Sequence, residues 1–372
     1  MTQPVTVLVL NAGSSTLKYG LFEGGAEQPA VSGTIEGTDF RASVARALDA
    51  AGAGKIEAVG HRVVHGGTAF RRSTLIDETV RAALDRLSEL APLHNPPALE
   101  GIAAAAEALP RVPQVAVFDT AFYADLPPRA YVYAVPYAWM TDWGIRRFGF
   151  HGINHAWCVE RAAELLAARA GARRFVTCHL GNGASATASR GGVAVATTMG
   201  YTPMEGLMMG TRSGSIDPGI MLAVQRERGL SAGELDEILN HGSGLLGVSG
   251  VSSDFREVDT AARSGDARAR LALEIYADRV RSAIGALAVT LGGLDALVFT
   301  AGIGENAAGL RASACAGLDC LGLRLDPSAN AACRPDADVS AKDSAAPILV
   351  LRAREELAIA RETRRVLGGG AS

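Results

Sequence analysis

The sequence has 372 residues, more than one ordinary hydrophobic core supports, so two domains are expected. Hydrophobic residues make up 48% and charged residues 20%, a balance typical of a globular protein that excludes extensive disorder. The net charge is −3 and no basic run exceeds a pair of arginines, so a nucleic-acid partner is not expected.

Three sequence features bear on cellular location. The start of the chain, MTQPVTVLVLNAG, has no basic segment before its apolar run, unlike a signal peptide. The most apolar stretch, residues 283–294, is about a dozen residues long, whereas roughly 20 are needed to cross a membrane. The five cysteines form no CxxC pair and do not suggest a disulfide framework. We therefore expect a cytoplasmic protein with no membrane partner.

The first third of the chain predicts a β-hairpin, then helices and a buried strand. An apolar run at 5–10 is followed by turn residues at 11–16 and a second strand at 17–22. Helices are expected over 78–90 and 97–108 from their apolar spacing. A strand over 114–118 ends in an acid, Asp119.

A second hairpin of the same design begins at residue 175. Its first strand, 175–180, leads into the tip GNGAS and a returning strand. The remaining expected elements are helices at 231–240, 267–291 and 355–367, strands at 296–300 and 347–351, and a glycine turn, AGIGEN, at 301–306. Strands that alternate with helices predict an α/β fold, and the two similar hairpins indicate two domains of one design facing a shared cleft.

Five segments combine glycine with small polar residues: NAGSSTLK, HRVVHGG, HLGNGAS, MMGTRSGSIDPG and FTAGIGEN. Any one of them is explained by a tight turn. Neither the P-loop spacing nor the dinucleotide fingerprint is present. Because there are five such segments and each follows an apolar strand, we favour the interpretation that their backbone amides face an anion.

With HNPP, FDTAF, RFGFHG, SSDFR and REELAIARET, these segments resemble the acetate kinase family, within the superfamily of acetate and sugar kinases, Hsc70 and actin. The resemblance runs from Val7 to about Arg364. It implies two domains of duplicated actin-like (ribonuclease H-like) fold, with ATP in the interdomain cleft, and a homodimer. The first domain is expected to be 1–123 with 357–372, and the second 124–356.

The reaction implied is reversible transfer of the γ-phosphoryl group of ATP to acetate, giving acetyl phosphate and ADP, with Mg²⁺ or Mn²⁺. A carboxylate with a pKa of about 4 to 5 is already ionised at neutral pH, so it needs no general base. The difficulty is to bring two anions together. Positioning and positive charge on the transferring phosphoryl group are therefore the expected means of catalysis.

Four residues are candidates for catalysis. Arg62 and Arg212 lie beside glycines, and a guanidinium matches phosphate and carboxylate oxygens. A surface position is the alternative for an arginine, but Arg62 lies in an apolar run where an unpaired charge is costly. The resemblance implies that both stabilise the phosphoryl transition state, that Arg62 also holds the carboxylate, and that His151 donates to the phosphoryl group. For Asp119 we expect electrostatic positioning.

Magnesium contacts are implied for Asn11 and Glu355, with Asp119 nearby. An acid that begins a helix is often only structural, but Mg²⁺ bound to phosphates takes one or two carboxylates. The first of two HxxxH pairs, His61 with His65, is expected to lie in a strand, and neither pair has the HExxH pattern, so zinc is not expected. The residues implied to contact ATP are Ser14, Thr16, Lys18, His179, Asn182, Gly183, Asp254, Phe255, Arg256, Gly302, Ile303, Gly304 and Asn306.

The resemblance also implies an apolar acceptor pocket. It is lined by Val64, Leu93, Phe150 and Pro203, with His94 on the same side, and these bulky side chains leave room for roughly a methyl group. One methylene in such a pocket is worth about 1–3 kcal/mol. Acetate is therefore the expected acceptor, with propionate a slower substrate.

Some positions depart from the family pattern. Thr68 stands where the family commonly has Glu, Tyr123 where it has His, Ile153 and Asn154 where it has Thr and Ser, and Ser215 where it has Asp. They bear on rate and acceptor preference. Three alternatives stay open: a propionate or butyrate kinase of the same superfamily, a non-catalytic actin- or Hsc70-like nucleotide switch, and an α/β oxidoreductase.

Overall fold

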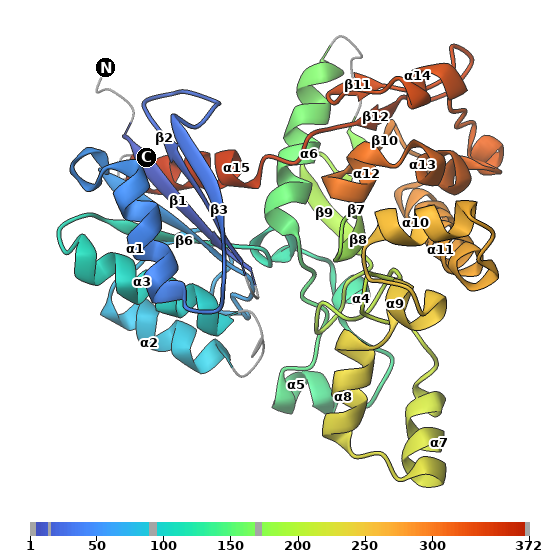
Figure 1. Cartoon of the computed structure of the whole chain (residues 1–372), viewed down its shortest axis with the longest axis horizontal. Helices are drawn as coiled ribbons and strands as arrows, with labels where there is room; N and C mark the ends of the chain where they lie inside the picture. Colours follow the sequence, from blue (N-terminus) through green and yellow to red (C-terminus); the bar gives the residue numbers. More distant parts are fainter. Residues whose placement is uncertain (1–4, 14–15, 89–94, 168–172, 369–372) are drawn as a thin grey trace. The chain divides into compact units, whose positions relative to one another are not determined.

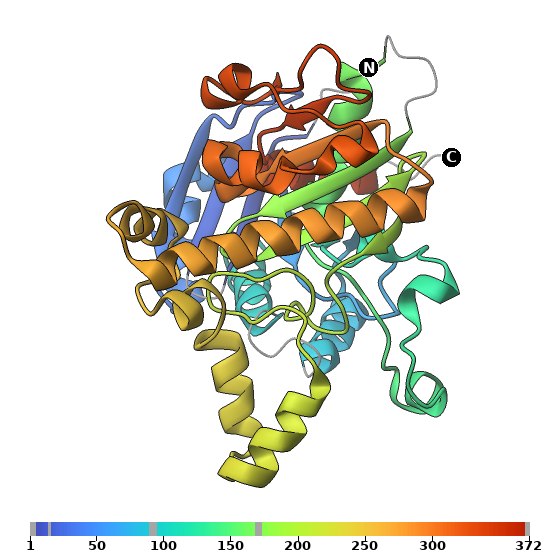
Figure 2. The same cartoon turned by 90° about the vertical axis from the view of Figure 1, so that its right-hand side faces the viewer.

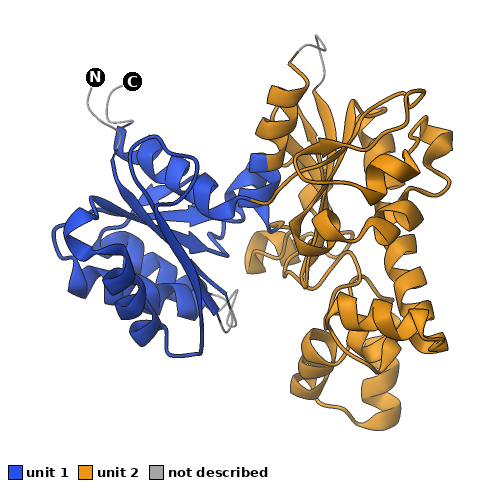
Figure 3. Cartoon of the chain, turned by 45° about the horizontal axis from the view of Figure 1, so that its top comes forward, with its two compact units in different colours: residues 1–124, 150–157, 354–372 blue, residues 125–149, 158–353 orange. Residues whose placement is uncertain are grey.

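The computed structural model describes residues 5–13, 16–88, 95–167 and 173–368. The chain forms two compact units, coloured separately in Figure 3. Unit 1 comprises residues 1–124, 150–157 and 354–372, and unit 2 comprises 125–149 and 158–353. The predicted domains differ in placing residues 150–157 with the second part, and that division stays a prediction.

Unit 1 is built on a six-stranded sheet (Figure 1). Its strands are β1 (Val7–Ala12), β2 (Thr16–Phe22), β3 (Val31–Glu36), β4 (Ala58–Val63), β5 (Thr74–Leu75) and β6 (Gln114–Phe118). They lie in the order β3-β2-β1-β4-β6-β5. The hairpin strands β1, β2 and β3 are antiparallel, while β1, β4 and β6 are parallel.

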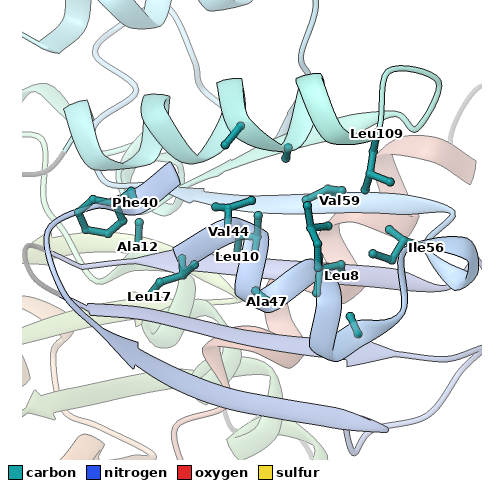
Figure 4. Packing of buried hydrophobic residues seen from close by; sticks show 14 of the residues in the cluster. Leu8, Leu10, Ala12, Leu17, Phe40, Val44, Ala47, Ile56, Val59 and Leu109 are labelled. Atoms are coloured by element: carbon teal, nitrogen blue, oxygen red, sulfur yellow. The ribbon is translucent and has the colours of Figure 1, made fainter. Parts of the chain in front are cut away.

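Helices cover both faces of this sheet. They are α1 (Phe40–Ala51), α2 (Glu78–Leu87), α3 (Asn95–Ala108) and α15 (Glu355–Gly368), with short 3₁₀ turns η1 (Ala53–Lys55) and η3 (Ala121–Tyr123). Leu8, Leu10 and Val59 pack with Val44 and Ala47 of α1 (Figure 4). The next residue, Gly60, faces α15 instead, because successive strand residues point to opposite faces.

Unit 2 contains a second six-stranded sheet. Its strands are β7 (Arg174–Leu180), β8 (Ala184–Arg190), β9 (Val193–Thr197), β10 (Ala296–Thr300), β11 (Ala337–Asp338) and β12 (Ile348–Val350). Their order is β11-β12-β10-β7-β8-β9, with β7, β10 and β12 parallel. If β7 to β12 are matched to β1 to β6 in chain order, the two sheets have the same topology. This confirms the predicted α/β class with a duplicated actin-like design.

The helices of unit 2 are α4 (Pro128–Tyr131), α5 (Ala138–Trp143), α7 (Pro218–Arg228), α8 (Ala232–His241), α9 (Gly244–Ser249), α10 (Phe255–Arg263), α11 (Ala267–Leu291), α12 (Ala301–Asn306), α13 (Ala308–Cys315) and α14 (Pro327–Ala331), with the 3₁₀ turn η4 (Leu318–Leu321). Helix α6 (Gly152–Leu165) begins in unit 1 and ends in unit 2. The long helix α11 packs on β7 and β8 (Figure 2). Within the described ranges, no helix has both the length and the apolarity needed to cross a membrane.

Two local predictions need correction. The AGIGEN segment, expected as a glycine turn, forms the short helix α12. The buried side chain of Arg311 stabilises its last turn by donating to the carbonyl oxygens of Gly304 and Glu305, each at 2.8 Å. Strand β4 ends at Val63, so only His61 of the first histidine pair lies in a strand.

Candidate active site

Three predicted residues of unit 1 meet at one edge of its sheet. Asn11 lies in β1, Arg62 in β4, and Asp119 directly follows β6. Because these strands are parallel neighbours, their carboxyl ends share an edge, where α/β proteins commonly bind ligands. Arg62 donates to Asp119 Oδ2 from Nη2 at 2.6 Å and from Nε at 3.1 Å, and its Nη1 lies 3.3 Å from Asn11 Oδ1.

Two adjacent glutamates at the start of α15 extend this cluster. The side-chain amide of Asn11 donates to Glu355 Oε2 at 3.2 Å and to Glu356 Oε1 at 3.0 Å. Glu355 was predicted, whereas Glu356 was not, although two consecutive acids in a first helical turn were a visible signal. The unit 1 cluster is therefore Asn11, Arg62, Asp119, Glu355 and Glu356.

Burial and charge act together on the central ion pair. Asp119 is 1% exposed as a side chain and Arg62 is 16% exposed. Burial by itself would lower the pKa of Arg62, but Asp119 and Glu355 outweigh burial and raise it, so the guanidinium stays charged. Burial, reinforced by Glu355, raises the pKa of Asp119, while Arg62 opposes that rise.

The donor atoms of the unit 1 cluster fit a magnesium ion. Apart from the Arg62 guanidinium, its side chains offer one amide oxygen and several carboxylate oxygens, the ligands that this hard cation prefers. Asp119 Oδ1 is buried and makes no hydrogen bond to a described residue. Within the part of the chain that the structure describes, no three His, Cys, Asp or Glu side chains gather into a ready metal cage.

His151 is fixed near Asp119 by its neighbours in the chain. The backbone N–H of Gly152 donates to the carbonyl oxygen of Asp119 at 3.1 Å, and a Cβ on Gly152 would lie 2.0 Å from that oxygen. The hydroxyl of Tyr123 donates to the carbonyl oxygen of Phe150 at 2.8 Å. His151 has φ of 57°, a left-handed conformation that costs about 1–3 kcal/mol in a non-glycine residue. The surrounding contacts hold this strained backbone in place.

Of the predicted acceptor pocket, unit 1 contributes Val64 and Phe150, both buried. The ring of His65 lies edge-on to Phe150 at 5.5 Å, and burial lowers the pKa of His65 to about 4, so it is neutral. The predicted residues Leu93, His94 and Ser14 lie outside the described residues. Pro203 belongs to unit 2.

Unit 2 contains a cavity of about 830 Å³, within the usual size range for a small-molecule site. Predicted nucleotide residues that line it are Asn182, Asp254, Phe255, Arg256, Gly302, Ile303 and Asn306. Its other walls come largely from α10, with Asp259, Thr260 and Arg263, and from the residues after α12. The α10 residues were missed, although they follow Phe255 on one amphipathic helix. His179, Gly183 and Gly304 are not among the lining residues.

Helix α10 begins at the cavity in a defined way. Asp254 is its N-cap and accepts from the backbone N–H of Arg256 at 2.8 Å, while its carboxylate pairs with the Arg256 guanidinium at 2.5 Å. The ring of Phe255 packs edge-on to Tyr276 of α11 at 6.1 Å. The side chain of Arg256 is 89% exposed, so most of it lies in water although the residue belongs to the cavity lining.

The other predicted residues are placed as follows. Arg212 donates from Nη1 to the carbonyl oxygen of Pro203 at 2.6 Å. His179 is near the end of β7 and is largely buried. Lys18 is exposed on β2, opposite Asn11 in the hairpin, and Thr16 begins that strand.

Comparison with known proteins identifies the family. The model of the acetokinase family matches residues 44–361. An acetate kinase of Gloeobacter violaceus is 57% identical over 309 residues, which is 83% of this chain and 76% of the relative. The crystal structure of Porphyromonas gingivalis acetate kinase matches with a TM-score of 0.88 at 38% identity, covering 98% of this chain and all (100%) of that one. A propionate kinase from Francisella tularensis also gives a TM-score of 0.88 at 38% identity, covering 97% of this chain and 100% of its own. The chain belongs to the acetokinase family.

Proposed function

We propose that this chain acts as an acetate kinase, reversibly transferring the γ-phosphoryl group of ATP to acetate. The observation that carries the proposal is the charged guanidinium of Arg62, held by Asp119 and Asn11 at the carboxyl edge of the unit 1 sheet. A family member with this arrangement has the fixed positive charge that a reaction between two anions needs.

In the forward reaction, an acetate oxygen forms a bond to the γ-phosphorus while the bond from that phosphorus to the β–γ bridging oxygen breaks. ADP leaves with the electron pair, and no proton has to move because acetate is already ionised. Arg62 orients the acetate carboxylate, and Arg62, Arg212 and His151 stabilise the charge on the planar phosphoryl group. Asp119 holds the planar guanidinium of Arg62 in the orientation in which it can bind the acetate carboxylate and the phosphoryl group.

Magnesium, when bound, neutralises charge on the ATP phosphates, and Mn²⁺ is expected to substitute for it. Asn11 and Glu355 are the proposed ligands, directly or through water, with Asp119 beside them. The closeness of these two side chains, with Asn11 Nδ2 3.2 Å from Glu355 Oε2, supports this assignment. Adenosine is assigned to the 830 Å³ cavity between α10 and α12.

The first domain is proposed to comprise residues 1–123 and 357–372, and the second domain residues 124–356. The enzyme is proposed to work in the cytoplasm as a homodimer. The dimer is supported by apolar side chains that α7 and α8 expose. Leu222 is 64% exposed, Ile220 47% and Ile238 43%.

A second candidate acceptor is propionate, because the propionate kinase structure is as similar as the acetate kinase structure in TM-score and identity. The buried Val64 and Phe150 favour acetate by limiting the space for a longer chain. One methylene is worth only about 1–3 kcal/mol, so propionate is expected as a slower substrate.

The test is acyl phosphate formation from ATP and Mg²⁺, trapped with hydroxylamine, with acetate, propionate, butyrate or no acid. A signal led by acetate supports the proposal, and one led by a longer acid supports the second candidate. Arg62→Lys should abolish the signal, whereas Arg41→Lys, at an exposed arginine paired with Glu107, should not. Nucleotide binding without acid-dependent product would refute the kinase assignment and favour the nucleotide switch.

A further inference from the structure

A polar cluster in unit 2 lies outside the residues assigned so far. It consists of Tyr133, Arg147 and Glu205, and we call it the Glu205 clamp. Arg147 Nη2 donates to Glu205 Oε1 at 2.5 Å, and the Tyr133 hydroxyl donates to Glu205 Oε2, also at 2.5 Å. Arg147 and Tyr133 precede Glu205 in the sequence by 58 and 72 residues respectively, so the clamp fixes tertiary structure.

The clamp holds both ends of the loop 198–206, which follows β9. At the start of the loop, Arg147 Nη1 donates to the carbonyl oxygens of Thr198 at 2.9 Å and Met199 at 2.8 Å. The Tyr133 hydroxyl also accepts from the backbone N–H of Tyr201 at 2.8 Å. At the end of the loop, Glu205 is the common partner of both side chains. One carboxylate therefore closes the loop on itself.

The space next to Gly200 is filled by the clamp. A Cβ built on Gly200 would lie 1.8 Å from Glu205 Oε2 and 2.3 Å from the Tyr133 hydroxyl oxygen, so only glycine fits there. The carbonyl oxygen of Gly200 accepts from the backbone N–H of Phe148 at 3.0 Å. Side-chain exposure is 17% for Arg147 and 33% for Glu205. The low exposure of Arg147 strengthens its attraction to Glu205.

The clamped loop carries one residue of the proposed acceptor pocket and contacts a proposed catalytic arginine. Pro203 lies within it, and its carbonyl oxygen accepts from Arg212 Nη1 at 2.6 Å. The segment that contains Arg147 and Phe148 leads directly to Phe150 and His151. A shift of the loop would therefore move the support of the Arg212 guanidinium.

We infer that Glu205 is a positioning residue for phosphoryl transfer, acting through the loop 198–206 on Pro203 and Arg212. This inference rests on the proposed function. Stability is a weak explanation for the clamp, because a partly buried ion pair seldom stabilises a fold more than apolar packing would. Placement is a stronger one, since a misplacement of about 1 Å at a distance from the chemistry can cost about 100-fold in rate.

The experiment compares Glu205→Gln with Asp295→Asn as a matched control. Asp295 also pairs with an arginine in unit 2, at 2.8 Å from Arg174, but directly precedes β10, at the end of that strand opposite α12. Both variants lose a carboxylate that an arginine contacts. Tyr133→Phe is the milder companion, because it removes the two hydrogen bonds of the hydroxyl, to Glu205 and from the Tyr201 N–H, and keeps the Arg147–Glu205 pair.

For each variant we would measure kcat, KM for acetate, KM for ATP, the Kd for ADP and the unfolding temperature. Glu205→Gln is expected to lose about 10- to 100-fold in kcat with KM for ATP and Kd for ADP unchanged. Tyr133→Phe should show a smaller loss of the same kind, and Asp295→Asn should lower only the unfolding temperature. A Glu205→Gln variant with wild-type kcat, or one in which kcat and ADP binding fall together as in a partly unfolded enzyme, overturns the inference.

The proposed function is tested separately by the wild-type enzyme. If it binds ADP and forms no acyl phosphate, the function fails before any variant is compared. If it forms acyl phosphate and both carboxylate variants keep full turnover, only the positioning role fails. If Glu205→Gln does not fold, Tyr133→Phe decides: a lowered kcat with unchanged ADP binding supports the role, and unchanged kcat refutes it.

Discussion

Breaking the Arg62–Asp119 pair should separate stability from turnover. In Asp119→Asn, the buried guanidinium loses the charge that accepts its two hydrogen bonds at 2.6 and 3.1 Å. Removing one partner of a buried pair costs about 3–5 kcal/mol. Glu355 and Glu356 also attract Arg62 and offset part of that cost, so we expect the lower end, about 3 kcal/mol.

The informative comparison is the double variant Arg62→Met with Asp119→Leu, which replaces the pair by apolar side chains of similar size. Such replacements are often close to neutral, so the double variant should recover most of the stability that Asp119→Asn loses. Its turnover should stay down by about 10³-fold or more, because the positive charge is gone. The free energy of unfolding would be measured by urea denaturation followed by circular dichroism, and turnover by the hydroxylamine assay. Additive losses of stability would refute the buried-pair reasoning, and recovered turnover would refute the role of Arg62.

Three further predictions concern single side chains. Arg212→Lys should lose about 10³-fold in kcat with the Kd for ADP unchanged, because an ammonium group cannot offer the planar geometry of a guanidinium. Enzyme assays would measure kcat and calorimetry the Kd, and equal losses in turnover and in ADP affinity would contradict the prediction. Arg311→Met should lower the free energy of unfolding by about 3–5 kcal/mol, since it leaves the buried acceptors of Gly304, Glu305 and Asn330 without their donor, and urea denaturation measures the loss. Burial lowers the pKa of His61 to about 4, below its unfolded value of roughly 6.5, so the unfolded state takes up a proton first as the pH falls and stability is lost. Between pH 7 and pH 5 that loss is about 2 kcal/mol for His61, and a His61→Gln variant should show a correspondingly flatter pH dependence of urea unfolding.

Much of the fold was accessible from local sequence patterns. The expected limits of β6, α11 and β10 agree with the structure, because each is a periodic or fully apolar segment between clear turn residues. Strand β3 was not predicted, since VSGTIE is a half-exposed edge strand whose pattern is weak. Helix α12 was misjudged because part of its support comes from Arg311, outside the segment itself.

Some residues of the candidate site could also be predicted from local sequence patterns, and others could not. Glycine-rich segments and acids at element ends drew attention to Asn11, Asp119 and Glu355, which the structure brings together with Arg62. Glu205 could not be found in this manner, because its role depends on partners 58 and 72 residues away. Nothing in the sequence next to it marks it as different from a surface glutamate. Contacts of that range are read only from a three-dimensional structure.

The return of α15 to unit 1 has a consequence for how the chain is made. Ile359 and Thr363 of this helix fit over Gly60, where an added Cβ would lie 2.3 Å from the Thr363 hydroxyl oxygen, and Ile359 is fully buried. The face of the unit 1 sheet that α15 covers is completed only when residues 355–368 have been made. On a ribosome adding about 5–20 residues per second, the roughly 230 residues between 124 and 355 take on the order of 10–50 s. During that interval the strands of the unit 1 sheet have been made but one apolar face lacks α15, so we expect the nascent N-terminal unit to be prone to aggregation until the helix is added.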